Sequence, residues 1–432
     1  MDGDAPPNPG LRRELGLAAV TLSGIGIILG AGIYALIGTA AGSAGNAVWL
    51  SFAVAAGVAF CTALSYAELA SMFPHSAAEY EYTNQSLGPS PAFIIGWLII
   101  FSGVLGAATV ALGFAGYFSV LTGVPLIPTG IALVLLLSAV LMAGIRESTT
   151  VAGIFTVIEI GGLAAVVIAG FPFLGTVDYL EMPAGTGGVI SAAALVFFAF
   201  LGFEEMVKFS EEAKNPERTI PKALVIALVS CTVLYILVAV SAVSVVGWEA
   251  LSASPAPFSL VAAAAWGPDG ALALSVIALF ATANTVLLML FAASRIMYGM
   301  AHSGALPALL ARVHPGRQTP WAAVLLAGAG AVLFLFAGNI GFVAGVTNFV
   351  VFVTFVTIDL TVILLRYRDP GRPRPFRAPW SVGRMPVFPV LGMLSCLFLL
   401  AGLEPVVIVT GLVIAGAGAV VGVTLGKRTR IA

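Results

Sequence analysis

Long apolar runs separated by short polar segments extend along the whole chain. A helix needs roughly 20 apolar residues to cross a bilayer, so this pattern predicts twelve membrane-spanning helices. Their expected ranges are 16–40, 46–72, 91–121, 127–143, 150–174, 187–209, 222–246, 270–300, 320–337, 341–365, 385–402 and 404–425. The apolar stretch 256–267 is too short to cross and is expected to form a short helix on the outer surface. No alternation of the outer-membrane barrel type occurs, so the fold class is an all-α integral membrane protein.

The composition supports this class. The chain is 60% hydrophobic and 9% charged, with a mean hydropathy of +1.07, too few charges to cover a water-soluble protein. The three cysteines, Cys61, Cys231 and Cys396, all lie within apolar runs, so neither a disulfide framework nor a redox motif is expected. The three histidines are far apart in sequence, which argues against a metal site. We expect no cofactor and no nucleic-acid partner; the partners are the lipid bilayer and a small molecule.

The positions of the basic residues predict the orientation of the chain. With the N-terminus inside, all 19 lysines and arginines, beginning with Arg12 and Arg13 and including Arg146, fall in inner segments. Cytoplasmic loops accumulate Lys and Arg, whereas translocated loops exclude them. The sequence therefore predicts a multi-pass protein of the cytoplasmic membrane. Its N-terminal tail (1–15) and C-terminal tail (426–432) are both expected to be cytoplasmic.

One carboxyl group is predicted at the middle of the bilayer. Glu159 lies roughly 14 Å into the fifth span, in a hydrocarbon core of ~30 Å. An ionisable group at this depth is costly unless it is paired, hydrated or protonated, so Glu159 is a functional candidate. The alternative is a neutral side chain that bonds a neighbouring backbone carbonyl. Asp359 and Glu68 lie nearer the cytoplasmic ends of their helices, and we expect structural roles for them.

The stretch "GIGIILGAGIY", residues 24–34, places four glycines inside the first span. They are consistent with a small-residue packing face. Alternatively, Gly30-Ala31-Gly32 interrupts the helix, which is tolerated only beside protein or a wet cavity. An interrupted helix presents free N–H groups that favour an anion and free carbonyls that favour a cation. An α-amino acid has both charges and matches such a site.

A second interruption is expected in the sixth span. If five helices form one repeat, the second copy enters the membrane from the opposite face, and the sixth span corresponds to the first. There, "FFAFLGFEEM" places Gly202 at mid-span among aromatic residues. A single glycine is a weak signal, and its position in the expected partner helix strengthens it.

Five segments, in this order, resemble the amino acid–polyamine–organocation superfamily of secondary transporters, and most of all its bacterial and cationic amino acid permease branches. They are "GIGIILGAGIYALIG", "YAELASMFPHSAAEYEY", "FFAFLGFEEMVKFSEEAKNPERTIPKAL", "AASRIMYGMAHSGALP" and "RPRPFRAPWSVGRMPVFPVLG". The resemblance covers nearly the whole chain.

The resemblance implies a fold of two inverted five-helix repeats, 16–174 and 187–365, with helices 1 and 6 unwound at the centre. Two extra helices follow in 385–425. It also implies that the substrate carboxylate meets the backbone amides of Gly30, Ala31 and Gly32. The substrate amino group would meet carbonyls near Ile27, Ile28, Phe200 and Leu201, beside the expected break at Gly202. Phe200 and Phe203 would cover the bound substrate.

The fifth span departs from the family pattern. Many proton-coupled relatives have a lysine where this sequence places Glu159, so their mechanism does not transfer unchanged. Three roles for Glu159 stay open: it cycles a proton as the coupling ion, binds another cation, or contributes to a site for a cationic substrate.

These observations predict a secondary transporter of amino acids that works by alternating access, and not an enzyme. No phosphate-binding loop of the G-x-x-x-x-G-K-[ST] type occurs, so gradients or exchange would drive transport. Proton-coupled symport is the first hypothesis, with Glu159 as the coupling carboxyl. The alternatives are a sodium-independent exchanger and a transporter of polyamines or organic amines. A membrane receptor or a channel is the non-transporter alternative.

Overall fold

The computed structural model describes residues 15–73, 78–143, 149–211, 213–317 and 319–428. In these residues the chain is helical apart from connecting loops and one two-stranded hairpin. The predicted N-terminal tail up to residue 14, with Arg12 and Arg13, lies outside the described residues. So do Arg146 and residues 429–432 of the C-terminal tail.

The apolar runs form the long helices. These are α3 (Val48–Met72), α5 (Pro89–Thr122), α6 (Leu126–Ala143), α7 (Thr149–Gly170), α9 (Pro216–Ala253), α10 (Pro257–His302), α12 (Ile340–Arg368) and α14 (Pro405–Arg428). Shorter helices are α1 (Leu17–Leu29), α2 (Gly32–Ala44), α4 (Ala78–Leu87), α8 (Gly185–Val196), α11 (Trp321–Leu335) and α13 (Val387–Ala401). The 3₁₀ segments are η1 (Gly45–Ala47), η2 (Phe171–Phe173), η3 (Phe197–Phe200), η4 (Glu204–Glu211) and η5 (Ala308–Ala311). The hairpin pairs β1 (Ser381–Val382) with β2 (Met385–Pro386).

Nine helical segments in the described part of the chain are long and apolar enough to cross a membrane. Three shorter apolar helices, α1, α11 and α13, accompany them. Each of the twelve predicted ranges overlaps one of these segments, with α1 and α2 together in the first range. The all-helical membrane class is therefore confirmed. The count of twelve crossings and the inverted repeat stay predictions.

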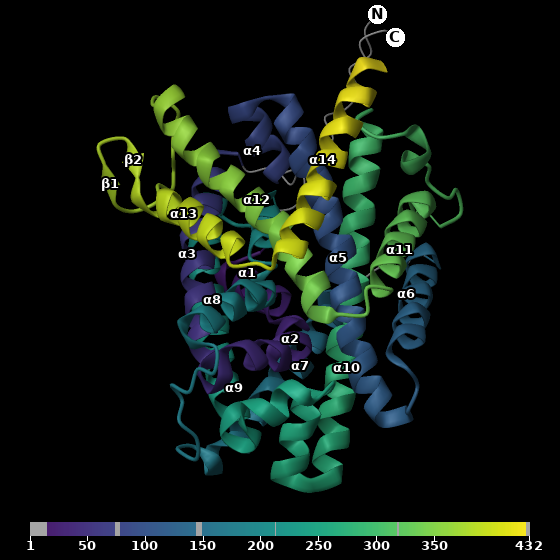
Figure 1. The fold of residues 1–432 in the computed structure, drawn as a ribbon. Helices are drawn as coiled ribbons and strands as arrows, with labels where there is room; N and C mark the ends of the chain where they lie inside the picture. Colours follow the sequence, from purple (N-terminus) through teal and green to yellow (C-terminus); the bar gives the residue numbers. More distant parts are fainter. Residues whose placement is uncertain (1–14, 74–77, 144–148, 212, 318, 429–432) are drawn as a thin grey trace, which may run out of the picture.

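In its described residues, the structure contains one helix that the apolar pattern did not predict. The polar stretch "AEYEYTNQSL" forms α4, which lies at the same end of the molecule as the C-terminal end of α14 (Figure 1). It has no apolar stripe that would have predicted a helix. The stretch 256–267, predicted as a short helix on the outer surface, is helical and forms the start of α10, before the turn at Gly267. One face of this helix is buried, while its Trp266 is 45% exposed. Its Phe258 is fully buried and meets the Tyr34 ring edge to face at 5.2 Å.

Two contacts tie the first span to later parts of the chain. At one end, the backbone N–H of Lys214 donates to the carbonyl of Leu15 at 2.8 Å, so the start of α1 is joined to the chain that follows η4. Toward the other end, the Glu181 carboxylate accepts from Asn46 Nδ2 at 2.6 Å and from Trp248 Nε1 at 3.2 Å. That carboxylate joins η1 to α9 through the loop before α8.

A buried ion network lies at the end of α3 and α12. Arg366 donates to both carboxylate oxygens of Glu68, at 3.0 Å from Nε and 2.5 Å from Nη2. The backbone N–H of Ala378 donates to the same carboxylate at 2.8 Å. Nearby, Asp359 accepts from Thr62 and Ser65 of α3 at 3.0 and 2.6 Å. Both acids are hydrogen-bonded within the fold, as a structural role requires.

Candidate functional site

The first helix is interrupted where the glycine pattern predicts it. Helix α1 ends at Leu29 and α2 begins at Gly32. Between them, the N–H of Ala31 donates to Thr285 Oγ1 of α10 at 3.0 Å. The first amides of a helix have no intrahelical acceptor. Within the described part of the chain, the amides of residues 32–34 have no other acceptor either. The start of α2 therefore presents unpaired N–H groups, which favour an anion.

The sixth span is interrupted at the predicted glycine. The 3₁₀ turn η3 ends at Phe200, and Gly202 has a φ of +114°, outside the helical range. The N–H of Gly202 donates to the carboxylate of Glu204 at 2.9 Å. The chain then continues as η4, a 3₁₀ segment of eight residues rather than an α-helix. A 3₁₀ run of this length is uncommon and marks a stretch that departs from regular helix geometry.

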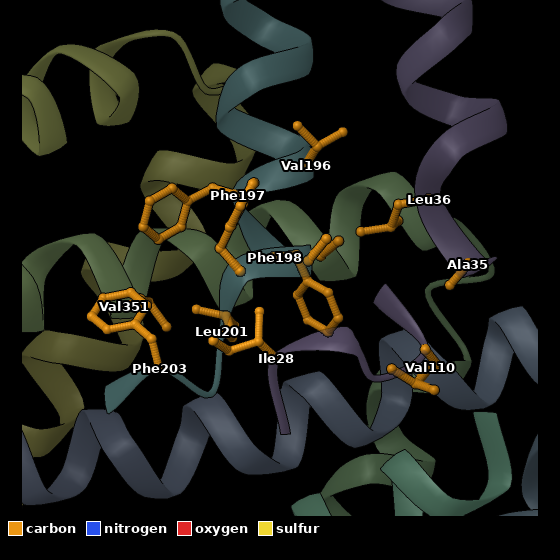
Figure 2. Packing of buried hydrophobic residues seen from close by; sticks show 14 of the residues in the cluster. Ile28, Ala35, Leu36, Val110, Val196, Phe197, Phe198, Leu201, Phe203 and Val351 are labelled. Atoms are coloured by element: carbon orange, nitrogen blue, oxygen red, sulfur yellow. The ribbon is translucent and has the colours of Figure 1, made fainter. Parts of the chain in front are cut away.

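The two interruptions touch one another. A Cβ atom at Gly202 would lie 2.9 Å from the carbonyl oxygen of Ile27, and one at Gly32 would lie 2.7 Å from Cα of Ala199. Separations of this size leave no room for a side chain, so both positions require glycine. Figure 2 shows the chain around Ile28 facing the chain around Leu201 among buried apolar side chains. The structure thus brings the predicted site residues of the first and sixth spans together.

A tyrosine of α9 contacts the carbonyl side of both interruptions. The Tyr235 hydroxyl lies 2.7 Å from the carbonyl oxygen of Ile28 and 2.8 Å from that of Ala199. The side chain is fully buried. At the first interruption the carbonyl of Ile28 is therefore hydrogen-bonded to Tyr235, and the amide of Ala31 is hydrogen-bonded to Thr285.

Glu159 lies halfway along α7 and next to the first interruption. Its side chain is 2% exposed and interacts with the side chain of Asn284, while Oε1 has no hydrogen-bond partner among the described residues. Tyr34 of α2 donates to the Glu159 backbone carbonyl at 2.9 Å. Because Asn284 and Thr285 are neighbours on α10, a short chain of contacts links the carboxyl to the amide of Ala31.

The two phenylalanines predicted as a substrate cover are fully buried in this structure. Phe200 packs against Tyr235 at 5.3 Å, and Phe203 packs against Phe355 and Tyr66 at 5.2 and 5.8 Å. The rings line the chain beside the interruption and fill space with other aromatic rings. Their role as a cover stays a prediction.

A cavity of about 110 Å³ lies along α2 beyond the interruption. Its lining includes Ala35 and Thr39 of α2, Gly113 of α5, Ser252 at the end of α9, and Ser254 of the connection between α9 and α10. None of the interruption residues lines it. It is a separate space, placed where α2 continues away from Gly32.

Sequence reasoning missed Tyr235, Asn284 and Thr285. The pair in α10 had a signal, because "ATANTVLL" places polar residues inside an apolar run. Tyr235 had none, since a tyrosine in a long apolar helix is ordinary. Only the packing of α9 against α1 assigns it to the site.

Comparisons with known proteins place the chain among transporters. The family model described as "Amino acid permease" matches residues 15–424. The branched-chain amino acid permease BcaP of Bacillus subtilis is 35% identical over 93% of this chain and 90% of its own length. The methylthioribose transporter of the same organism is 33% identical over 92% and 89%. The vacuolar cationic amino acid transporter 4 of Arabidopsis thaliana is 29% identical over 83% and 64%.

Proposed function

The chain belongs to the amino acid permease family, and on that premise we propose that it moves amino acids across the cytoplasmic membrane as a secondary transporter. Alternating access exposes the region between the first and sixth spans to one side at a time. Both proteins of Bacillus subtilis named above are transporters and not enzymes. We further propose where the charged groups of the substrate bind, which substrate is transported and which gradient drives transport.

One observation carries the proposal that the substrate is an amino acid. Unpaired amides at the start of α2 lie close to carbonyls from both interrupted helices. The amides favour the α-carboxylate and the carbonyls favour the ammonium group. The Ala31 amide is already bonded to Thr285, so in this conformation the carboxylate would take the amides of Gly32 and the two residues after it.

The relatives suggest three substrate classes to compare: branched-chain amino acids, cationic amino acids and methylthioribose. We propose a branched-chain or other neutral amino acid, because the surroundings of the interruptions are apolar and aromatic. Purified protein in proteoliposomes should take up L-isoleucine saturably and L-lysine less well. Methylthioribose lacks both charged groups of an amino acid. Preferred uptake of methylthioribose would overturn the amino acid assignment.

Glu159 is the proposed coupling group. A buried carboxyl with an oxygen that lacks a partner in the described structure can hold a proton, and a lost proton would leave a charge that favours a cation nearby. The proposal is supported by the contacts of Glu159 with Asn284 and Tyr34, which lie next to the first interruption. We propose symport of one amino acid with a proton. Obligate exchange is the second candidate, because it needs no coupling ion.

The coupling proposal predicts the behaviour of Glu159→Gln in proteoliposomes. Uptake driven by an inward proton gradient should be lost, because an amide cannot bind and release the proton. Exchange of internal for external L-isoleucine should persist. Asp269→Asn is the control, since Asp269 is an exposed acid between α9 and the long part of α10. Gradient-driven uptake that is the same in Glu159→Gln and wild type would exclude Glu159 as the coupling group.

A further inference from the structure

The two interruptions deprive several carbonyl groups of their helical donors, among them those of Ile28 and Ala199. In a regular helix the carbonyl of Ile28 would accept from residue 32, and that of Ala199 would accept from residue 203. Neither bond is present. Among the described residues, the Tyr235 hydroxyl is the hydrogen-bond donor within reach of both oxygens, at 2.7 and 2.8 Å.

A phenol has one proton and two carbonyl oxygens compete for it. The hydroxyl can therefore donate to only one of them at any moment. The other carbonyl keeps its lone pairs unpaired in a buried site, where an unsatisfied polar group is costly. The pair is one donor short, and a further N–H donor would complete it.

Packing fixes the phenol in this position. The ring meets Phe200 edge to face at 5.3 Å and Phe52 of α3 at 5.7 Å, and it is fully buried. One turn earlier on α9, Cys231 Sγ lies 4.0 Å from the carbonyl oxygen of Ile25. This face of α9 therefore follows α1 up to the interruption, and the ring has little freedom to leave.

We propose that Tyr235 is a positioning residue that holds the carbonyls of Ile28 and Ala199 together and leaves one of them open to the ammonium group of the substrate. The inference rests on the proposed function, since it assumes a substrate with an amine. Ammonium binding supplies the missing donor, and the phenol proton stays on the second carbonyl. Recognition of the amine thus depends on a side chain that the sequence pattern does not reveal.

The test is Tyr235→Phe, measured as saturable uptake of L-isoleucine and L-lysine in proteoliposomes. The variant keeps the ring and removes the proton, so the two carbonyls lose their common partner and separate. We expect the KM of the transported amino acid to rise about tenfold, the size of one lost hydrogen bond to a charged group. A merely structural defect would reduce the number of active transporters and lower Vmax with an unchanged KM.

Tyr82→Phe is the matched control, because the Tyr82 hydroxyl is buried on α4 without a hydrogen-bond partner in the described residues. Its KM should equal that of wild type. If Tyr235→Phe is not recovered folded, Phe52→Leu provides a second measurement. It keeps the hydroxyl and loosens the ring, and a smaller rise in KM is expected.

Two outcomes overturn the inference, and they are distinguishable. An unchanged KM in Tyr235→Phe, with wild type active, excludes the positioning role and leaves the proposed function intact. Absence of saturable uptake of either amino acid by wild type contradicts the proposed function, and this inference with it.

Discussion

The glycines of the first span meet different demands. A Cβ at Gly24 would collide with the Met206 side chain and one at Gly26 with Thr156, so these two serve close packing. At Gly30 the nearest atom to such a Cβ is Thr285 Oγ1 at 3.3 Å, which is tight but less crowded. Gly24 and Gly26 therefore belong to a small-residue packing face, while the helix is interrupted at Gly30. Small residues allow neighbours to approach, and the interruption follows them.

Gly202 is a residue at which a minimal substitution should have a large local effect. In Gly202→Ala, the added methyl group would lie 2.9 Å from the Ile27 carbonyl oxygen, and a φ of +114° is one that L side chains rarely adopt. We expect the free energy of unfolding to fall by about 1–3 kcal/mol. A lower melting temperature in detergent, with reduced uptake, is the readout. Gly57→Ala, on an exposed position with open space, should be near neutral; equal melting temperatures for the two variants would contradict this account.

Residue patterns predicted the interruptions but not their partners. Gly30 belongs to a pair of glycines that permits a break in the first span, Gly202 lies in the expected partner helix, and Glu159 is a carboxyl in an apolar span, where ionisable residues are rare. Tyr235 and Thr285 are ordinary residues of apolar helices. Their contacts with Ile28, Ala199 and Ala31 join positions far apart in the chain, and only packing brings them together.

At the scale of elements, hydrophobic length predicted where helices run, and turn geometry decided where they bend. α9 and α10 extend past their predicted ends because Gly247 and Gly267, with φ of +74° and +76°, turn the chain without a long loop. Hydropathy carries no information on such turns. Nor does hydropathy reveal a polar helix such as α4, because that helix has no apolar run.

One of the contacts that link α3 to α12 is the buried ion pair between Glu68 and Arg366. In Arg366→Met, Glu68 keeps the hydrogen bond from the Ala378 amide and the ion pair with Arg374, whose Nε lies 3.5 Å away. It loses both hydrogen bonds from Arg366. Breaking a buried pair from one side is strongly destabilising, by about 3–5 kcal/mol. Thermal unfolding in detergent should show this as a large drop in melting temperature.

Arg372→Met is the comparison for that measurement. Arg372 lies just after the end of α12, its side chain is 34% exposed, and its contact with Asp369 is 3.9 Å. An exposed pair contributes roughly 0–1 kcal/mol, so the melting temperature should change little. Similar losses in the two variants would mean that the arginines act through general charge and not through the buried pair.

For the whole molecule, the orientation in the membrane is open to a direct test. In a variant without Cys61, Cys231 and Cys396, a cysteine at exposed Asp269 should react with an impermeant maleimide added outside intact cells. One at exposed Arg384, beside the β1–β2 hairpin, should react only after permeabilisation. The expectation follows from the exclusion of basic residues from translocated loops. Labelling of both positions from outside would contradict the predicted topology.

The Leu15–Lys214 bond and the Glu181 contacts have a joint consequence for how the molecule can move. The first joins the beginning of α1 to the chain that follows η4. The second joins η1, which follows α2, to α9. Because of these contacts, neither α1 nor η4 can move away from the other without breaking the hydrogen bond between Lys214 and Leu15. A motion that preserves these hydrogen bonds must move α1 and η4 together as one rigid body. The backbone would then bend at the two interruptions, at Gly30 and at Gly202.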